Sequence, residues 1–328
     1  MKMKKKKILL ICPVELDILI NKDIKILKKY YDVSVFVYRG KKDRFKLLKA
    51  VLETDLNISW FSWTYTRWAI IFSKIFRKKT IVIAAGYDAV NMPEINYGAM
   101  RNAKSAKIAK YGFENADKVI AVSNSIRDGV LQYTNRKDVK TVYHAFDYNK
   151  FKPDGPKEGF VITVGNVNKS NLQRKGLETF VKAAQYLPDV RFVLIGKHLD
   201  DSIDYLRSIA APNVEFTGWV SDEKLLGYMQ KAKVYVQVSY HEGFGLSIAE
   251  AMLCECVPVV TDRGAIPEVV GETGFYVPFG DAKTTAEAIK KAMESNLGKK
   301  ARERIKTLFP LEKREKELID AVEGLIAN

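Results

Sequence analysis

Two glutamates stand eight positions apart in the segment HEGFGLSIAEAM, residues 241–252, with Gly243-Phe244-Gly245 between them. The residues KVYVQVSY before this segment predict a buried strand, and the residues from Ser247 onward predict a helix. Glycines at a strand-to-helix corner let the backbone approach a ligand closely. The carboxylates of Glu242 and Glu250 can each accept hydrogen bonds from hydroxyl groups. The segment therefore predicts a site for a ligand with many hydroxyls.

A purely structural interpretation also fits part of this pattern. Ser247, followed three residues later by Glu250, matches a capping box, in which the glutamate closes the start of a helix. Such a cap stabilises a helix by about 1 kcal/mol. It accounts for Glu250, but it explains neither Glu242 nor the two glycines, so both interpretations stay open at this point.

A second corner carries two cations. Gly165 follows the predicted strand VITV, and Arg174-Lys175-Gly176 come shortly before a predicted helix. Loops that lead from parallel strands into helix N-termini bind phosphates. Arg174 can make paired hydrogen bonds to a diphosphate and Lys175 can act as a point charge, although a solvated pair of cations would fit the composition equally well. Phosphates at this corner and hydroxyls at the other are the properties of a nucleotide sugar.

Short apolar runs alternate with helix-compatible stretches along the whole chain. The predicted strands are KKILLICPV, VSVFVY, TIVIAA, KVIAVS and KTVYHA in the first half, and GFVITVGNV, RFVLIG, VEFTGWV, KVYVQVSY, VPVVTD and GFYVP in the second. A last helical stretch from Lys283 is interrupted at residues 296–298 and at Pro310. This alternation predicts an α/β protein with two Rossmann-like, doubly wound domains that face a cleft, with ligands at the carboxyl ends of the strands.

The 328 residues are too many for one ordinary core and suggest two domains. We expect an N-terminal acceptor-binding domain over residues 1–148 and a linker over residues 149–158, where Pro153, Gly155 and Pro156 cluster. A C-terminal nucleotide-sugar-binding domain should follow over residues 159–305. A final helix over residues 306–328 could cross back to the first domain.

The formal charge of +15 is unevenly distributed. Residues 1–150 hold 30 Lys and Arg against 14 Asp and Glu, a net +16, whereas the remainder holds 24 against 25, a net −1. The two halves should therefore face different partners. The short N-terminal apolar run meets Glu15 and Asp17 at once, which argues against a signal peptide, and no run of roughly 20 apolar residues predicts a membrane span. We expect a cytoplasmic protein.

Residues 59–79, SWFSWTYTRWAIIFSKIFRKK, hold three of the four tryptophans and end in a basic cluster. Trp and Tyr favour the membrane interface, while Lys and Arg favour anionic headgroups. Arg101, Lys104, Lys107 and Lys110 add charge on a predicted helix. These features suggest peripheral docking on the inner face of the cell membrane. The alternative is that the aromatics pack in the core and the lysines are solvated. Nucleic acid is not an expected partner, because no nucleic-acid-binding motif is present.

The span Glu242-Gly-Phe-Gly-Leu…Glu250-Ala-Met…Val257-Pro-Val-Val resembles the Glu-x7-Glu signature of the family-four retaining glycosyltransferases, which have the GT-B fold. Three neighbouring segments agree with this resemblance: VITVGNV…RKGLETFVKAA resembles the Gly-loop and Arg/Lys segment, TDRGAIPEVVGETGFYVPFGD the segment after the signature, and VYHAFDYNKFKP the hinge. Together they cover nearly all of residues 142–282 in the family's order. The first half matches only in its layout.

The resemblance implies that a sugar is transferred from a UDP- or GDP-linked donor to a hydroxyl of a lipid-linked or glycan acceptor. Glu250 would hold the ribose and Glu242 the sugar hydroxyls, while Arg174 and Lys175 would stabilise the departing diphosphate. The implied donor-binding residues are Gly165, Asn166, Arg174, Lys175, Gly196, Glu242, Gly243, Phe244, Gly245, Leu246 and Glu250. Fixed cations make a metal unnecessary, and no Asp-x-Asp motif is present. We therefore expect neither a metal nor a cofactor to be required.

Several positions depart from the family pattern. His144-Ala145-Phe146-Asp147 replaces the hinge Asn-Gly-Val-Asp, Glu255 stands where a glycine often ends the helix, and the first strand leads into CPVELDILINKD without a glycine pair. Where many members have a histidine, this chain reads Ala84-Ala85-Gly86-Tyr87-Asp88. Asp88 and Tyr87 are candidates for positioning a reacting hydroxyl, and an ordinary turn is the alternative. His198 and His241 are weaker candidates beside the donor.

Other functions remain compatible with these patterns. A sugar-nucleotide epimerase or a phosphorylase with the GT-B fold would use the same donor site, although no lysine for pyridoxal phosphate is identifiable in the chain. A non-catalytic sugar-nucleotide-binding or membrane-associated module would also fit. The cysteines Cys12, Cys254 and Cys256 have no disulfide or metal spacing, and we expect them to be buried thiols.

Overall fold

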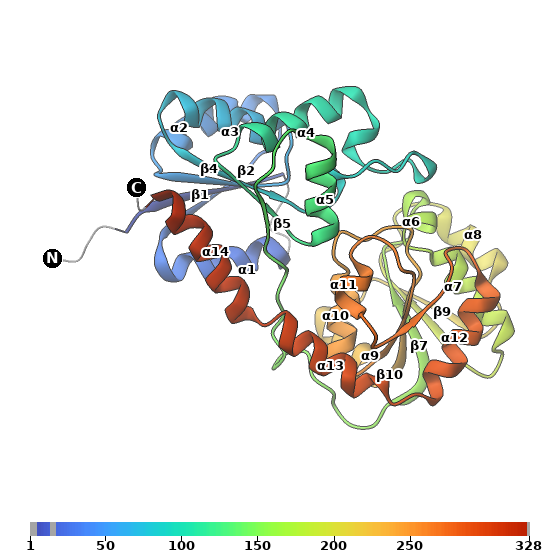
Figure 1. The fold of residues 1–328 in the computed structure, drawn as a ribbon. Coiled ribbons are helices and arrows are strands. Elements are labelled where there is room, and N and C mark those ends of the chain that lie inside the picture. Colours follow the sequence, from blue (N-terminus) through green and yellow to red (C-terminus); the bar gives the residue numbers. More distant parts are fainter. Residues whose placement is uncertain (1–4, 14–17, 327–328) are drawn as a thin grey trace. The chain divides into compact units, whose positions relative to one another are not determined.

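A computed structural model describes residues 5–13 and 18–326. The chain forms two compact units, each with a six-stranded parallel sheet and helices on both faces (Figure 1). Unit 1 consists of residues 1–144 and 312–328, and unit 2 of residues 145–311. The chain thus leaves unit 1 inside the hinge segment His144-Ala145, a few residues before the Pro- and Gly-rich stretch 149–158. Glu15 and Asp17 lie outside the described residues.

Unit 1 alternates strands and helices from its first strand onward. Its strands are β1 (Lys7–Cys12), β2 (Asp32–Val37), β3 (Leu56–Trp60), β4 (Lys79–Ala84), β5 (Lys118–Ala121) and β6 (Val139–Thr141). Its helices are α1 (Ile18–Tyr30), α2 (Arg44–Leu52), α3 (Thr64–Ile75), α4 (Ala103–Asn115), α5 (Asn124–Tyr133) and α14 (Leu311–Ile326), and four 3-10 turns lie between them: η1 (Lys41–Asp43), η2 (Tyr87–Ala89), η3 (Pro93–Ile95) and η4 (Ala99–Arg101).

The unit 1 sheet has the order β2-β1-β3-β4-β5-β6, and alternate residues of β1 explain its two helical layers. Leu9 and Ile11 pack in one cluster with Leu47 of α2 and Ala69 of α3. The neighbouring residues of β1 pack in another cluster with apolar residues of α1 and α14. Figure 1 accordingly shows α2, α3 and α4 on one face of the sheet and α1 and α14 on the other.

Strand β3 is not among the strands that the sequence pattern predicts. Its sequence LNISW places two polar residues in a fully buried strand. The Asn57 side chain receives a hydrogen bond from Thr54 Oγ1 (3.0 Å) and donates one to Ser73 Oγ of α3 (2.9 Å). These contacts satisfy the buried amide, which lets a polar residue occupy the core.

The aromatic residues of segment 59–79 belong largely to the interior. Trp60 and Tyr65 are each 1% exposed, and Trp63 packs against the core from a partly buried position. Trp60 lies on a central strand of the sheet, so for this residue the structure agrees with the alternative that the aromatics pack in the core. Among the residues the structure describes, no helix is long and apolar enough to span a bilayer.

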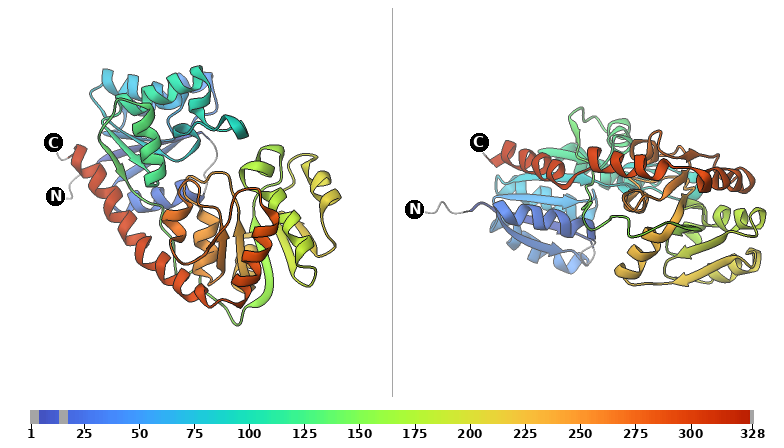
Figure 2. Two further views of the ribbon diagram at one scale, coloured as in Figure 1. Left: turned by 45° about the vertical axis from the view of Figure 1, so that its right-hand side comes forward. Right: turned by 90° about the horizontal axis from the view of Figure 1, so that it is seen from below.

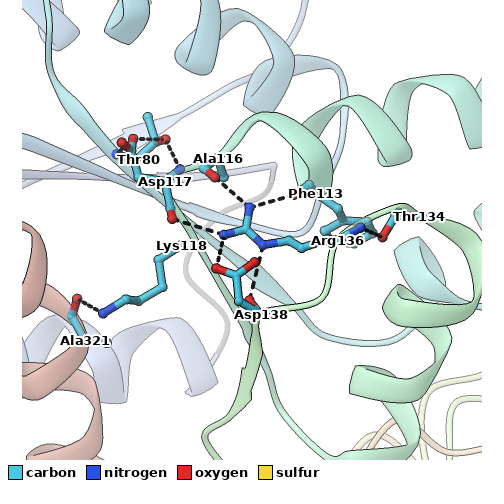
Figure 3. Close-up of polar contacts among 9 residues, drawn as sticks. All are labelled: Thr80, Phe113, Ala116, Asp117, Lys118, Thr134, Arg136, Asp138 and Ala321. Carbon is cyan, nitrogen blue, oxygen red and sulfur yellow. Dashed lines mark hydrogen bonds and ion pairs between the residues drawn. The ribbon is translucent and has the colours of Figure 1, made fainter.

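Arg136 fastens the C-terminal end of α4 to unit 1 (Figure 3). Its guanidinium donates to the carbonyls of Phe113 (2.9 Å), Ala116 (2.6 Å) and Asp117 (3.0 Å), and to the Asp138 carboxylate (2.9 Å). The last carbonyls of a helix have no partner within the helix, so one side chain here satisfies several of them. The position of α4 on its sheet is thereby fixed.

Helix α14 returns to unit 1 and lies beside α1 (Figure 2). Arg314, 3% exposed, makes a bidentate pair with Asp23 of α1 at 2.7 and 2.8 Å. Its remaining nitrogen donates to the carbonyls of Val142 (3.0 Å) and Tyr143 (2.7 Å), and the guanidinium lies 5.9 Å from the centre of the Trp60 ring. This buried pair holds the C-terminal helix on the N-terminal sheet.

Unit 2 repeats the alternation. Its strands are β7 (Glu158–Val164), β8 (Arg191–Ile195), β9 (Val214–Gly218), β10 (Ala232–Gln237), β11 (Val257–Val260) and β12 (Phe275–Tyr276). Its helices are α6 (Lys169–Arg174), α7 (Leu177–Ala183), the 3-10 turn η5 (Ala184–Tyr186), α8 (Ser202–Ile209), α9 (Asp222–Lys231), α10 (Leu246–Leu253), α11 (Ile266–Val270), α12 (Ala282–Glu294) and α13 (Leu297–Leu308). The break between α12 and α13 falls at residues 295–296, so Leu297 and Gly298 of the predicted interruption belong to α13, and the predicted break at Pro310 separates α13 from α14.

The sheet order in unit 2 is β12-β11-β10-β7-β8-β9, the doubly wound order in which β7 and β10 are central neighbours. The chain winds outward from β7 in one direction and from β10 in the other. Ligands of such sheets bind at the carboxyl ends of these two strands, where the direction reverses. The loop after β7 leads to Arg174 and Lys175, and the loop after β10 carries Glu242.

Candidate functional site

The loops after β7 and β10 bring the two predicted corners together. Arg174 is the last residue of α6, a short helix that the sequence pattern does not reveal, and Lys175 follows it. The backbone N–H of Tyr240, in the loop after β10, donates to the Arg174 carbonyl at 2.9 Å. Gly176 has a φ of 64°, and a Cβ there would lie 2.1 Å from the Val238 carbonyl oxygen. Glycine is therefore required where these two loops touch.

Glu242 is the centre of this cluster. Its Oε1 lies 3.4 Å from Lys175 Nζ and 4.0 Å from Arg174 Nη1. The same oxygen accepts hydrogen bonds from Gln237 Nε2 (2.6 Å) and Ser239 Oγ (3.1 Å). All four contacts are made by one carboxylate oxygen, so the carboxylate is held in one orientation.

The charges around Glu242 control its protonation. Burial alone would raise the pKa of this carboxyl, since its side chain is only 12% exposed. Lys175 and Arg174 outweigh that effect and, with the Ser239 hydrogen bond, hold the Glu242 pKa below its ordinary value. The cluster thus favours the anionic form of Glu242 and combines it with two basic side chains, a formal net charge of +1 that suits a bound anion.

Arg174 is oriented by a chain of amide side chains. Asn171 Oδ1 accepts from Arg174 Nη2 (2.7 Å) and Nε (3.2 Å), and Asn171 Nδ2 donates to the carbonyl of Asn166 (2.7 Å). The side chain of Asn166 in turn accepts from the backbone N–H of Lys197 (3.1 Å). These hydrogen bonds join the guanidinium to the loop after β7 and to the residues that follow β8.

The predicted donor-binding residues Gly165, Asn166 and Gly196 lie together at this edge. A Cβ on Gly196 would lie 2.1 Å from the Gly165 carbonyl oxygen, so the two backbones pass each other in contact. The Gly165 N–H donates to the Ile195 carbonyl at 2.9 Å. These glycines serve close packing between adjacent strand ends, and Asn166 beside them is exposed.

Sequence reasoning missed Gln237 and Ser239, which hold Glu242. Tyr235, Gln237 and Ser239 alternate along the strand and its extension, and alternate residues of a strand share one face. The buried Tyr235 hydroxyl donates to Gln237 Oε1 at 2.9 Å, which orients the amide toward Glu242. Three polar residues with a period of two, alternating with Val234, Val236 and Val238, are the signal that could have identified this support.

Helix α10 excludes the capping-box interpretation of Glu250. The helix starts at Leu246 with Gly245 as its N-cap, and no side-chain hydrogen bond closes this end. Ser247 is therefore the second helical residue and Glu250 the fifth, two residues beyond the third helical position that a capping glutamate occupies. Glu250 is half-buried in the middle of α10, so it requires another explanation.

Phe244 anchors the glycine-bracketed loop. Its side chain, 3% exposed, has ring centres of Phe146 at 5.9 Å and of Phe309 at 5.3 Å. The phenylalanine that replaces the usual valine in the hinge segment thus packs directly behind the loop. Phe244 thus fixes the backbone of this loop, and the family resemblance implies that the amides of Phe244, Gly245 and Leu246 face the sugar and the distal phosphate.

Two backbone positions carry unusual conformations, one beside Glu242 and one after the C-terminal end of α10. Gly264, with a φ of 60°, lies so close to Glu242 that a Cβ would be 2.4 Å from the Glu242 carbonyl oxygen. Glu255 follows α10 with a φ of 67°. That left-handed conformation explains why a glycine is common here in the resembling family, and this chain adopts it with a side chain present.

Asp88 occupies a buried position in unit 1. Its carboxylate accepts backbone hydrogen bonds from Ser62 (2.8 Å), Gly86 (3.1 Å) and Ala85 (3.2 Å). Burial raises the pKa of Asp88 to about 6, although the three hydrogen bonds lower it. These contacts join the turns after β3 and β4, and Tyr87 beside it is 39% exposed. A role for either residue in positioning a hydroxyl stays a prediction.

The histidines and cysteines offer little additional chemistry. His241 is 5% exposed and burial lowers its pKa to about 4, so it is neutral at pH 7. His198 follows β8, and burial also lowers its pKa. The three cysteines are buried, as predicted. Within the described ranges 5–13 and 18–326, no group of three or more His, Cys, Asp or Glu is arranged to hold a metal ion.

Comparison of the sequence with known proteins finds a matching family model and several relatives. Residues 158–295 match the family model described as Glycosyl transferases group 1. An uncharacterized glycosyltransferase of Methanocaldococcus jannaschii is 25% identical over 92% of this chain and 83% of its own length. The capsular polysaccharide biosynthesis glycosyltransferase CapM of Staphylococcus aureus is 30% identical over 59% of this chain, and the alignment spans less than two thirds, 58%, of that relative.

Solved structures share the fold over nearly the whole chain. Anabaena HepE in complex with UDP and glucose has a TM-score of 0.81 at 20% identity, covering 98% of this chain and 100% of that one. Sucrose-phosphate synthase from Thermosynechococcus elongatus has a TM-score of 0.77 at 18% identity and the same coverage. The fold is therefore the two-domain α/β fold called GT-B. The family match and the relatives support glycosyl transfer.

Proposed function

We propose that this chain is a retaining glycosyltransferase that moves a sugar from a nucleoside-diphosphate-sugar donor to an acceptor hydroxyl. The proposal rests on the cluster at the carboxyl ends of β7 and β10, where Lys175 and Arg174 lie 3.4 and 4.0 Å from Glu242. Two cations beside one anion, in loops braced by buried hydrogen bonds, suit a ligand that is both charged and hydroxylated.

Arg174 and Lys175 would act on the leaving group. Transfer breaks the bond between the anomeric carbon and a diphosphate oxygen, and the bonding electron pair leaves with the diphosphate. The acceptor oxygen bonds to the anomeric carbon on the same face, and one proton is released in the net reaction. Negative charge grows on the diphosphate in the transition state, so fixed cations stabilise that state more than the bound donor.

Glu242 and Glu250 would bind opposite ends of the donor. Oε1 of Glu242 is engaged by protein groups, so Oε2 is the oxygen that we assign to the sugar hydroxyls. Glu250, four residues into α10 from Leu246, is assigned to the ribose. The Anabaena structure contains UDP and glucose, so a protein of this fold binds a nucleoside diphosphate and a sugar. We extend that class to this chain, with a glycan or lipid-linked acceptor.

Exchange of each glutamate separates these two roles. Glu250→Ala should weaken binding of the donor and of the bare nucleoside diphosphate, whereas Glu242→Ala should chiefly reduce discrimination between sugars. Thermal stabilisation by a panel of nucleotide sugars measures both, because a ligand at 100 times its dissociation constant adds about 2.7 kcal/mol of stability. Full turnover and unchanged donor preference in both variants would disprove these assignments.

We further propose that transfer needs no metal ion. Arg174 and Lys175 supply the positive charge that a metal would otherwise supply beside a diphosphate. Release of nucleoside diphosphate from the donor should therefore continue at an unchanged rate in excess chelator. A preparation that loses activity in chelator and regains it with a divalent cation would contradict this proposal.

A further inference from the structure

Charge in unit 1 is segregated between its two helical layers. Helices α2, α3 and α4 together contain eight Lys and Arg and a single acid, Glu114. On the opposite face of the sheet, α1 and α14 contain seven Lys and Arg against six Asp and Glu. The net charge is thus +7 on one layer and +1 on the other. The α2–α3–α4 layer is therefore the more basic of the two helical layers.

The α2–α3–α4 layer is continuous. Helices α2 and α3 pack against each other, and α3 packs against α4 (Figure 1). Lys74 of α3 donates to the Asn115 side chain of α4 at 2.7 Å, and Ser62 before α3 donates to the Ala109 carbonyl at 2.7 Å. Arg136 closes the end of α4, as Figure 3 shows. The layer is a fixed surface rather than a set of independent helices.

The outer side of α2 combines apolar and basic side chains. Phe45 is 82% exposed and Leu52 is 44% exposed, and both share one helical face with the exposed Lys49 at spacings of four and seven residues. Lys46 is exposed beside them, while the opposite side of the helix is buried through Leu47 and Val51. A phenylalanine so exposed gains nothing from the protein's own core.

A further apolar side chain extends this surface to α3. Ile75, the last residue of α3, is 64% exposed. Helices α2 and α3 each connect parallel strands, so they run in the same direction, and their C-terminal residues Leu52 and Ile75 lie at the same end of the sheet. Exposed Lys74 and Arg77 flank Ile75. Protein surfaces that lie on membranes typically combine apolar side chains with cations that border them.

We propose that the α2–α3–α4 layer docks on an anionic lipid bilayer, with Phe45, Leu52 and Ile75 entering the headgroup region. The cations attract the anionic surface, and each contributes roughly fivefold in partitioning near it. A soluble polyanion would be attracted by the same charges but would leave Phe45 in water. The apolar side chains therefore favour a bilayer. This inference rests on the proposed function in one respect: docking would bring the active site to a lipid-linked acceptor.

Matched charge variants test this surface. The full-length protein should float with vesicles of phosphatidylglycerol at low ionic strength, but not with vesicles of phosphatidylcholine. The pair K46E and K49E on α2 should reduce partitioning by about tenfold or more. The pair K25E and K28E, exposed on α1 in the other layer, changes the net charge by the same amount and should leave binding within about twofold of wild type. An equal loss of vesicle binding in both double variants would overturn the proposal, because it would show that binding depends on net charge and not on one face.

Phe45→Ser distinguishes a bilayer from a soluble polyanion. This variant should bind phosphatidylglycerol vesicles more weakly than wild type, yet bind heparin as wild type does. Unchanged vesicle binding by Phe45→Ser, or no vesicle binding by the wild type, would end the proposal. Donor hydrolysis without vesicles should be the same in all these variants. Face-specific vesicle binding by a protein that cannot turn over any donor would refute the proposed function and leave the docking surface standing.

Discussion

Replacing Lys175 with methionine should lower kcat for sugar transfer by about 100- to 1,000-fold, a loss of roughly 2.7–4 kcal/mol of transition-state stabilisation. Methionine keeps most of the length of the side chain and removes the ammonium group that lies 3.4 Å from Glu242. Because that charge acts mainly on the departing diphosphate, KM for the donor should change much less than kcat. Steady-state kinetics with a saturating acceptor measures both constants.

Lys231→Met is the matched control. Lys231 ends α9 and pairs with Glu158 at 3.0 Å, at the amino end of β7 and therefore at the opposite edge of the same sheet. Its loss removes one charge from the same domain without touching the site, so kcat should stay near the wild-type value. Equal kcat in the Lys175 and Lys231 variants would exclude the leaving-group role. A rise in KM with unchanged kcat would show that Lys175 binds the donor and the transition state equally well and does not act on the leaving group.

Replacing Arg314 with methionine should destabilise unit 1 by roughly 3–5 kcal/mol. The substitution leaves the Asp23 carboxylate, 0% exposed, without the guanidinium that contacts both of its oxygens. It also removes the donors to the carbonyls of Val142 and Tyr143. A buried charge without its partner is costly, and here it would weaken the attachment of α14.

Tryptophan fluorescence during urea unfolding is well suited to measure this loss. Trp60, Trp63 and Trp68 all belong to unit 1, whereas Trp219 of unit 2 is already 67% exposed. The signal therefore reports chiefly on unit 1. A double variant, Arg314→Met with Asp23→Leu, should recover most of the stability, because it removes both buried charges. A loss below about 1 kcal/mol in the single variant would show that this pair does not hold α14.

The strands of unit 2 could be predicted because their apolar runs are short, β-branched and bounded by turn residues. Strand β3 could not, since the buried amide of Asn57 donates to Ser73 of α3, sixteen residues further along the chain. Only the fold brings that partner to Asn57. For the same reason, the sequence left open whether Trp60 lies at a membrane interface or in the core, and the structure places it in a buried strand.

The charged residues of the candidate site could be predicted from the sequence, but the residues that orient them could not. Arg174, Lys175 and Glu242 are distinguished by residue type at predicted corners. Gln237 and Asn171, which orient them, are polar residues of ordinary appearance whose function depends on tertiary distances of 2.6 and 2.7 Å. The proposed docking surface was found only through exposure, because nothing in the pattern of α2 distinguishes the exposed Phe45 from a core residue.

The most direct test is a structure of this protein with a nucleotide sugar bound. It should place the diphosphate oxygens about 3 Å from the Arg174 guanidinium and the Lys175 ammonium, at the carboxyl ends of β7 and β10. The sugar should then contact Glu242 and the ribose Glu250. A ligand bound at another edge of the sheet, or a diphosphate too far from both cations for contact, would contradict the account.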